Sequence, residues 1–411
     1  MSKRILAGLD IGTSAIRVVL VGYNEQAEGE HLTLLGFGSA PTEGMRRGMV
    51  VEPEDVAKSI RAALRDAEQK TGIAVDHAYI SFGGAGLGLL PAKGVVAVSR
   101  ADGEISEADI ERVRAATRSS LPQLPNREIL HEIPTSFTVD REVGVKNPLG
   151  MIGSRLEAEV LFITAFTPHL RSLIKSVETA GVSIDDIIAA PLASAHATLS
   201  KHQKDIGVMS LDLGGGTASM AVFEEGMLVS ANIFPVGSMH ITNDIAIGFQ
   251  LPLEIAEQVK VEHGGLIISD SAKKEGVRLA DFSSDINATV SKKELSDIIE
   301  ARATDIFELV EKHLRKIGRS GLLPSGVVLT GGGASLRGIT EFARRELRLP
   351  ANVGTPRLTS STGEHLIDSG WSVAVGLCVW ADEHEPRQTF MKGFSSKLSK
   401  RILGWIRPLI P

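Results

Sequence analysis

The fold of this chain is decided by Val208-Met-Ser-Leu-Asp212-Leu-Gly214-Gly215-Gly216-Thr217-Ala-Ser-Met-Ala-Val-Phe223, because an earlier stretch matches it part for part. That stretch is Ile5-Leu-Ala-Gly-Leu-Asp10-Ile-Gly12-Thr13-Ser14-Ala-Ile-Arg-Val-Val-Leu-Val21. In each, a β-rich run ends in Leu-Asp-x-Gly, a turn of small residues with a hydroxyl follows, and a second β-rich run returns, which predicts a hairpin. Glycines in one such turn commonly just supply positive φ. Two matched copies predict two related α/β halves that face each other across a cleft.

Both turns have the chemistry of phosphate binding. Glycine turns let backbone N–H groups approach phosphate oxygens, and side-chain hydroxyls add donors. The predicted phosphate-binding residues are Gly12, Thr13, Ser14, Gly214, Gly215, Gly216 and Thr217. Asp10 and Asp212, at the ends of adjoining central strands, are expected to face the phosphates and to hold a hydrated Mg²⁺, which keeps most of its waters. The sequence contains no Walker-type Gly-x-x-x-x-Gly-Lys-Ser/Thr, which excludes the P-loop class.

A third glycine cluster predicts a contact with a nucleoside. It runs Thr330-Gly331-Gly332-Gly333-Ala-Ser335-Leu336 and has the pattern of a strand, a glycine turn and a helix start. A dinucleotide fingerprint requires glycine where Leu336 stands, so that class is excluded. A flat nucleoside lying against the turn explains the cluster better. In the helical pattern from Leu253 to Gly264, Glu257 and Lys260 share one face and, taken alone, are most simply a solvated pair.

Together these motifs resemble the phosphate-1, phosphate-2 and adenosine motifs of the actin, Hsp70 and sugar-kinase superfamily. Within it, nearly the whole chain resembles the FtsA family of bacterial cell-division proteins. That likeness rests on the opening Ala7-Gly-Leu-Asp-Ile-Gly-Thr-Ser14, on Ile80-Ser-Phe-Gly-Gly84 before an unusual inserted block, and on a basic amphipathic end. It implies an α/β, actin-like duplicated ATPase fold with two lobes around a nucleotide cleft, and ATP and Mg²⁺ as cofactors. It also implies adenosine contacts from Glu257, Lys260, Gly331, Gly332, Gly333 and Ser335, and a further glycine near the phosphates at Gly237.

The chain differs from Hsp70 at the position of the residue that assists ATP hydrolysis there. Ala190-Pro191-Leu-Ala-Ser resembles the connecting helix that carries a Glu before Pro in Hsp70, but Ala190 takes that position here. Because turnover needs a group that orients the attacking water, and no other positioned base is evident, the catalytic residue is unknown. We expect a slow ATPase or a nucleotide-dependent switch.

The resemblance and the element pattern predict six parts. Helices are expected over 53–71, from Ser106 to about Arg118 and from Ser291 to about Gly318, with strands over 127–139 and 155–163. The parts are a first core subdomain of 1–84, 164–203 and 365–381; an inserted α/β subdomain of 85–163; a second core subdomain of 204–245 and 303–364; an outer subdomain of 246–302; a linker of 382–393; and a membrane-targeting amphipathic helix of 394–411. The resemblance implies that 246–302 docks the C-terminal peptide of the tubulin-like FtsZ, and that 85–163 meets later division proteins.

The charge distribution points to a membrane at one end of the chain. The 44 basic and 50 acidic residues give a net charge of −6, but the last 26 residues carry six basic side chains and no acidic one, which leaves −12 on the rest. A basic amphipathic helix lying among anionic headgroups fits this end better than a terminal helix packed on the core. Polymerisation would strengthen the weak membrane binding of a single molecule through avidity. The predicted membrane-contacting residues are Phe394, Lys397, Leu398, Lys400, Arg401, Ile402, Trp405, Ile406 and Arg407.

Composition sets the remaining expectations. A lone cysteine, Cys378 in an apolar run, indicates a reducing compartment and a buried side chain. No window approaches the roughly 20 apolar residues of a membrane span, and the start has no secretory pattern. An acidic body with 4% aromatic residues disfavours nucleic acid.

We therefore expect an ATP-binding adaptor that polymerises on the cytoplasmic face of the cell membrane at the division site, tethers the FtsZ ring and recruits later division proteins. The alternatives are a sugar or metabolite kinase, which would need a catalytic Asp aimed at a substrate hydroxyl, and a pilus-assembly protein of the same architecture. An Hsp70-like chaperone would need a substrate-binding domain after the ATPase core, which we do not expect.

Overall fold

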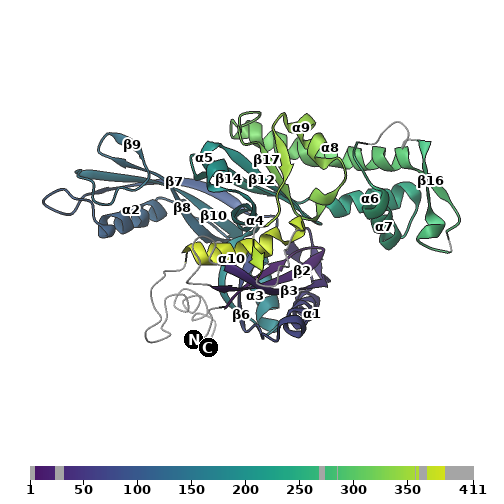
Figure 1. The fold of residues 1–411 in the computed structure, drawn as a ribbon. Coiled ribbons are helices and arrows are strands. Elements are labelled where there is room, and N and C mark those ends of the chain that lie inside the picture. Colours follow the sequence, from purple (N-terminus) through teal and green to yellow (C-terminus); the bar gives the residue numbers. More distant parts are fainter. Residues whose placement is uncertain are drawn as a thin grey trace.

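The first of two related sheets builds the lower lobe in Figure 1. The computed structural model describes residues 5–23, 32–267, 274–284, 286–356, 358–360 and 368–384. The sheet has the order β11-β6-β1-β2-β3-β19. Its strands are β1 (Ile5–Ile11), β2 (Ala15–Tyr23), β3 (Leu32–Pro41), β6 (His77–Phe82), β11 (Ser183–Ala189) and β19 (Thr359–Ser360). β1 is antiparallel to β2 and parallel to β6, so the predicted hairpin lies in the middle of the sheet.

The second sheet repeats this arrangement. Its order is β14-β13-β12-β17-β18. The strands are β12 (Val208–Leu213), β13 (Ala218–Glu224), β14 (Met227–Phe234), β17 (Val327–Thr330) and β18 (Ala351–Val353). β12 is antiparallel to β13 and parallel to β17, as β1 is to β2 and β6. The same pairing around both hairpins confirms the duplicated actin-like fold predicted from the two matching turns.

Helices fill the space between the sheets and cover their outer faces. α4 (Ala190–Thr198) and α10 (Ser372–His384) lie between the sheets, in one core cluster with residues of β1, β2, β13 and β17. α1 (Pro53–Thr71) and α3 (Thr167–Thr179) cover the other face of the first sheet. The α4–α10 crossing is so close that a Cβ on Gly376 would lie 1.8 Å from the Ala193 carbonyl oxygen. Cys378 is fully buried in α10, and burial raises the pKa of its thiol to about 12, which makes it an inert packing residue.

A separate four-stranded sheet projects from one side of the molecule (Figure 1). Its order is β7-β10-β8-β9. It contains β7 (Gly88–Ala97), β8 (Arg127–Val139), β9 (Glu142–Val145) and β10 (Arg155–Phe166), with α2 (Glu107–Ser119) packed on it. Ser106 and Asp109 form a reciprocal capping box at the start of α2, the helix expected from Ser106. The sheet and α2 share their own apolar cluster around Val113, Leu156 and Phe162.

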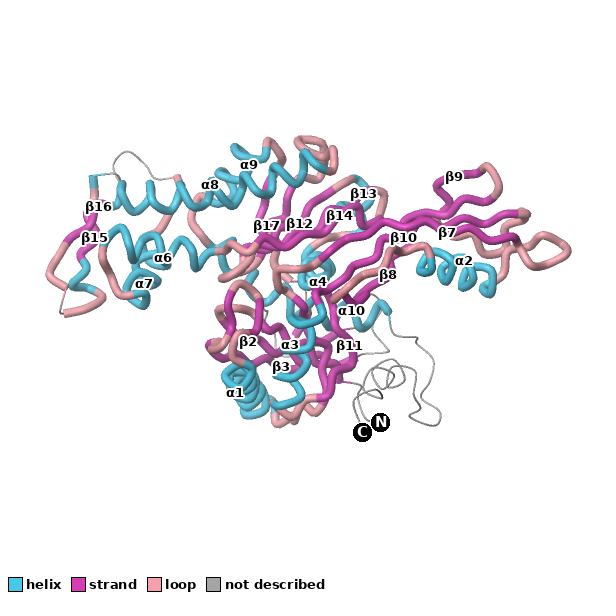
Figure 2. Tube along the Cα trace, turned by 180° about the vertical axis from the view of Figure 1, so that it is seen from behind, coloured by secondary structure: helices cyan, strands magenta, loops and turns pink. Residues whose placement is uncertain are grey.

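The opposite side of the second lobe is helical, as the reverse view in Figure 2 also shows. It contains α6 (Ser238–Phe249), α7 (Leu253–His263), the two-stranded β15 (Gly276–Arg278) and β16 (Thr289–Ser291), and the long α8 (Lys292–Lys316). The Ser291 hydroxyl accepts from the Glu294 N–H at 3.4 Å and caps α8. One apolar stripe of α8 is buried at Leu295, Ile299, Ile306, Val310 and Leu314, whereas Leu309 is exposed.

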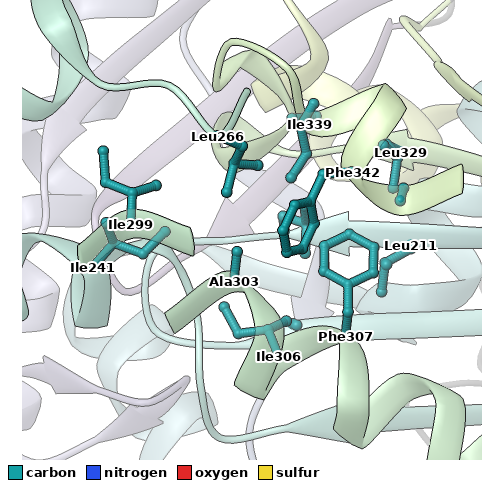
Figure 3. Packing of buried hydrophobic residues seen from close by; sticks show 14 of the residues in the cluster. Leu211, Ile241, Leu266, Ile299, Ala303, Ile306, Phe307, Leu329, Ile339 and Phe342 are labelled. Atoms are coloured by element: carbon teal, nitrogen blue, oxygen red, sulfur yellow. The ribbon is translucent and has the colours of Figure 1, made fainter. Parts of the chain in front are cut away.

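Figure 3 shows how α8 holds this lobe together. Ile299, Ala303, Ile306 and Phe307 of α8 meet residues of β12, β17 and α9 (Ile339–Leu347) in one core. The Phe307 and Phe342 rings pack edge to face with centroids 5.5 Å apart, a favoured aromatic geometry. α8 therefore joins the outer helices to the second sheet through one apolar core.

The end of the chain is described only in part. α10 continues to His384, so Asp382 to His384, which the sequence assigns to a linker, are helical. The rest of that linker and the predicted amphipathic helix over 394–411 lie outside the described residues. Within the part of the chain that the structure does describe, no helix is long and apolar enough to cross a membrane.

Candidate functional site

The three glycine motifs line one cavity between the two lobes. It has a volume of about 280 Å³ and receives residues from both sheets and from α7. Of the predicted site residues, these line it: Asp10, Gly12, Thr13, Ser14, Asp212, Gly214, Gly215, Gly216, Thr217, Glu257, Lys260, Gly331, Gly332, Gly333 and Ser335. Gly237 stands behind the second turn, where a Cβ would lie 2.5 Å from the Gly214 carbonyl oxygen. The predicted membrane residues lie outside the described part of the chain.

The two turns match in detail and touch each other. A Cβ on Gly12 would lie 2.8 Å from the carbonyl oxygen three residues on, and a Cβ on Gly214 would lie 2.9 Å from the equivalent oxygen. A Cβ on Gly216 would collide with the Thr13 side chain, 2.4 Å from its Oγ1. The turns are thus two copies of one backbone shape, pressed together at the place where ligand phosphates would meet them.

The two aspartates form a buried acidic pair. Asp10 Oδ1 accepts from the Ser81 hydroxyl at 2.8 Å, and Ser81 Oγ accepts from the Ile11 N–H at 3.1 Å. Burial raises the pKa of Asp10, although Arg17 and Ser81 oppose the shift. Burial, and then the nearby Asp10 carboxylate, raise the pKa of Asp212 to about 7. A dication between the two carboxylates would lower both pKa values. Two carboxylates in a polar cavity suit Mg²⁺ held largely through water.

Arg17 also lines the cavity, although no motif in the sequence points to it. It pairs directly with Asp10 in the β1–β2 register. Its guanidinium lies over the Trp371 ring, 5.7 Å from the centroid, and opposes the raised pKa of both aspartates. The only sequence signal for it is a lone charge within the apolar run from Ala15 to Val21.

Glu257 and Lys260 are tied into the wall of the cavity. Lys260 is buried, and its Nζ donates to Glu257 Oε2 at 2.7 Å and to Thr242 Oγ1 at 2.8 Å. Thr242 also donates to Glu257, so the pair fixes α7 to α6. The simple interpretation of a solvated pair is therefore wrong for Lys260. Glu257 keeps a side chain that is 47% exposed and remains available to a ligand.

The third glycine turn is pressed against Asp212 and against the start of α10. Gly331 has a φ of 78°, and a Cβ there would lie 2.2 Å from Asp212 Oδ1. The Ser369 carbonyl accepts from the Gly331 N–H and the Thr330 hydroxyl, each at 3.1 Å, and the Ser369 hydroxyl donates back to the Gly331 carbonyl at 2.9 Å. Gly332 has no atom within 4 Å of such a Cβ and is open to the cavity.

Ala190 also lines the cavity, at the first residue of α4. Its methyl group offers no acid or base to an attacking water. The titratable side chains that line the cavity are Asp10, Arg17, Asp212, Glu257, Lys260 and Arg337.

Two α/β sheets of the same topology around one cleft define an actin-like protein, and solved structures agree. The PilM–PilN type IV pilus biogenesis complex matches at a TM-score of 0.66 and 19% identity, covering 93% of this chain and 99% of that one. MreB5 of Spiroplasma citri, in a structure bound to ADP, matches at 0.55 and 14%, covering 92% and 97%. At such identities the likeness concerns the fold alone.

Family models and relatives in other bacteria identify the family as well as the fold. The model "Cell division protein FtsA" matches residues 209–376, and "SHS2 domain inserted in FTSA" matches 84–164. Cell division protein FtsA of Pseudomonas aeruginosa is 33% identical over 92% of this chain and 89% of its own length, and that of Bacillus subtilis is 35% identical over 92% and 84%. The chain belongs to the FtsA family and is an actin-like cell-division protein. This membership favours neither the kinase nor the pilus-assembly alternative.

Proposed function

We propose that the cavity binds Mg·ATP and that the bound nucleotide governs assembly of the protein into a polymer on the membrane. The observation that carries the proposal is the convergence of two matching glycine turns, each preceded by a buried aspartate, with the Gly331 turn. The turns offer backbone N–H groups and the hydroxyls of Thr13, Ser14 and Thr217 to phosphates. Gly331 to Gly333, Ser335, Glu257 and Lys260 form the nucleoside side.

Asp10 and Asp212 would hold Mg²⁺ mainly through its waters, and the ion would neutralise charge on the phosphates. Arg17, beside both carboxylates, balances the negative charge that remains. With Ala190 where a water-orienting carboxylate would be needed, hydrolysis is slow. The protein is an adaptor whose state depends on nucleotide rather than a metabolic enzyme.

Membership of the family supports the partners and the location. The protein tethers the FtsZ ring through the FtsZ C-terminal peptide bound at 246–302, and recruits later division proteins through 85–163. The segment 394–411 holds it at anionic lipid on the cytoplasmic face of the cell membrane, as a peripheral protein at the division site. The six-part division given from the sequence belongs to the same proposal. Nucleic acid has no part in it.

Calorimetry with Mg·ATP tests the nucleotide proposal. Asp212→Asn keeps the side chain's shape but removes its charge, so we expect affinity to fall by about tenfold or more, because hydrogen bonds to charged groups contribute about 1.5–3 kcal/mol. Asp297→Asn, exposed on α8, is the matched control and should bind as the wild type does. Equal affinity in Asp212→Asn and wild type would mean that the aspartate turns serve another purpose.

A further inference from the structure

A short hairpin that the sequence motifs do not include lies at the phosphate end of the cavity. It consists of β4 (Met45–Arg46) and β5 (Met49–Val50), joined by the two-residue turn Arg47–Gly48. Gly48 lines the cavity, and its N–H donates to Thr13 Oγ1 at 2.8 Å. Thr13 is the residue that meets Gly216 of the opposite turn, so the hairpin tip stands where the two phosphate turns touch.

The hairpin backbone is held in place from several sides. The Val51 and Glu52 N–H groups donate to the Gly44 carbonyl at 2.8 and 3.1 Å and close the hairpin base. A Cβ on Gly48 would lie 2.3 Å from the Gly83 carbonyl oxygen, so the tip packs directly on the loop after β6. These contacts hold the backbone on both sides of residue 47.

Arg47 is an unusual residue for this turn. Arg47 and Gly48 have φ values of 51° and 73°, as in the two-residue turns that favour Asn-Gly or Gly-Gly. A long side chain in the left-handed region is unfavourable, and such exceptions gather at functional sites. The Arg47 side chain is exposed and forms no ion pair or hydrogen bond with another described residue. A charge with no structural task is thus held in an unfavourable backbone conformation one residue before Gly48, which lines the cavity.

The Arg47 charge also acts on the opposite lobe. The pKa of His240 in α6 is lowered by burial first, and the positive charges of Arg47 and Arg302 add to the shift, against Asp244 and the Gly237 hydrogen bond. His240 Nδ1 lies 3.1 Å from the Gly237 nitrogen and 3.2 Å from the Gly237 carbonyl oxygen, and Gly237 packs behind Gly214 and Gly215. Arg47 therefore belongs to the first lobe, and its charge acts on His240 of the second, which contacts Gly237 behind the phosphate turn.

We propose that Arg47 contacts the terminal phosphate of the bound nucleoside triphosphate and makes the cavity discriminate triphosphate from diphosphate. Guanidinium groups pair with phosphate oxygens through two parallel hydrogen bonds. The nucleoside residues Glu257 and Gly331 to Gly333 come from α7 and from the turn after β17, not from the two phosphate turns, so a nucleoside held by them directs its last phosphate toward the Thr13–Gly216 contact and Arg47. A diphosphate ends short of that contact and gains little from Arg47. The inference rests on the proposed nucleotide binding and deepens it.

The test compares affinities for Mg·ADP and for a non-hydrolysable Mg·ATP analogue by calorimetry. Arg47→Asn removes the charge but keeps a residue that accepts the left-handed turn. We expect about tenfold weaker binding of the ATP analogue, the effect of losing one charge-assisted hydrogen-bonded pair, and less than twofold change for ADP. Arg47→Lys should recover part of the loss. Arg46→Asn, the matched control on the neighbouring exposed arginine, should bind both nucleotides as the wild type does.

The outcomes separate the two proposals. If the wild type binds both nucleotides and Arg47→Asn keeps the wild-type ratio of affinities, the role of Arg47 is refuted while the nucleotide site stands. An equal loss for both nucleotides also refutes it, because it means that the substitution disturbs the turn. If the wild type binds neither nucleotide, both proposals fail. Thermal unfolding of each variant without ligand shows that the fold is intact.

Discussion

Position 331 requires glycine for two separate reasons. Its φ is 78°, and a Cβ there would lie 2.2 Å from Asp212 Oδ1. We expect Gly331→Ala to lower the free energy of unfolding by about 1–3 kcal/mol, through backbone strain and displacement of the carboxylate. Gly332→Ala is the adjacent control, because nothing lies within 4 Å of its Cβ, and it should change stability by less than about 0.5 kcal/mol. Urea denaturation measures both variants, and equal midpoints would contradict the geometry of this turn.

His131 of β8 makes the free energy of unfolding depend on pH. Its Nε2 accepts from the Ala189 N–H at 3.1 Å, and burial, followed by the charges of His384 and His196, lowers its pKa to about 3. An unfolded histidine titrates near pH 6.5, so the unfolded chain binds the proton first. The His131 contribution is therefore complete above about pH 6.5 and is lost as the pH falls toward 3, with a slope of up to about 1.4 kcal/mol per pH unit.

Replacing the histidine isolates this effect. His131→Gln keeps an acceptor for the Ala189 N–H but does not titrate, so its free energy of unfolding should fall less steeply between pH 6.5 and 4. His202→Gln, on an exposed histidine, should follow the wild-type curve. Parallel curves for His131→Gln and wild type, measured by denaturant unfolding at each pH, would rule out His131 as the source.

Among the elements, the segment 394–411 gives the sharpest test, and its prediction comes from sequence alone. Trp405→Glu should release the protein from anionic liposomes, because it places a charge on the predicted apolar face. Ser396→Glu adds the same charge nine residues away, which is about 180° around a helix and so on the polar face. Co-sedimentation should fall strongly for Trp405→Glu and modestly for Ser396→Glu. Equal retention of Trp405→Glu and wild type would remove the membrane helix from the proposal.

The elements also show how far sequence reasoning reaches. Both central hairpins, α1, α2 and the strands β8 and β10 of the inserted sheet follow from turn glycines, helical patterns and β-rich runs, which are local signals, whereas β7 and β9 of that sheet were not predicted. Arg17 was not predicted as a cavity residue, because a charged residue in a strand usually faces solvent. Its place across from Asp10 appears only once the register is known. The burial of Lys260 depends on Thr242, 18 residues away on another helix. The β4–β5 hairpin has two-residue strands, too short for any periodicity.

At the scale of the whole molecule, the proposal predicts filaments that require both ligand and surface. Full-length protein with Mg·ATP and anionic vesicles should pellet and show filaments by electron microscopy, because membrane grip and self-association reinforce each other through avidity. Asp212→Asn, at equal protein concentration, should pellet less. A wild-type protein that stays monomeric with ATP and lipid together would refute polymerisation on the membrane.

The path of α10 gives this molecule a mechanical property. Ser369, just before the helix, is hydrogen-bonded to both Thr330 and Gly331, and the 13 residues of α10 then extend about 20 Å between the sheets. Its last residue, His384, leads into the basic end of the chain. A force applied to that end would pass along α10, whose N-terminal end is hydrogen-bonded through Ser369 to the Gly331 turn. Under the proposed function, α10 therefore links the membrane-binding segment mechanically to a turn that contacts the nucleotide, so tension on the one would reach the other.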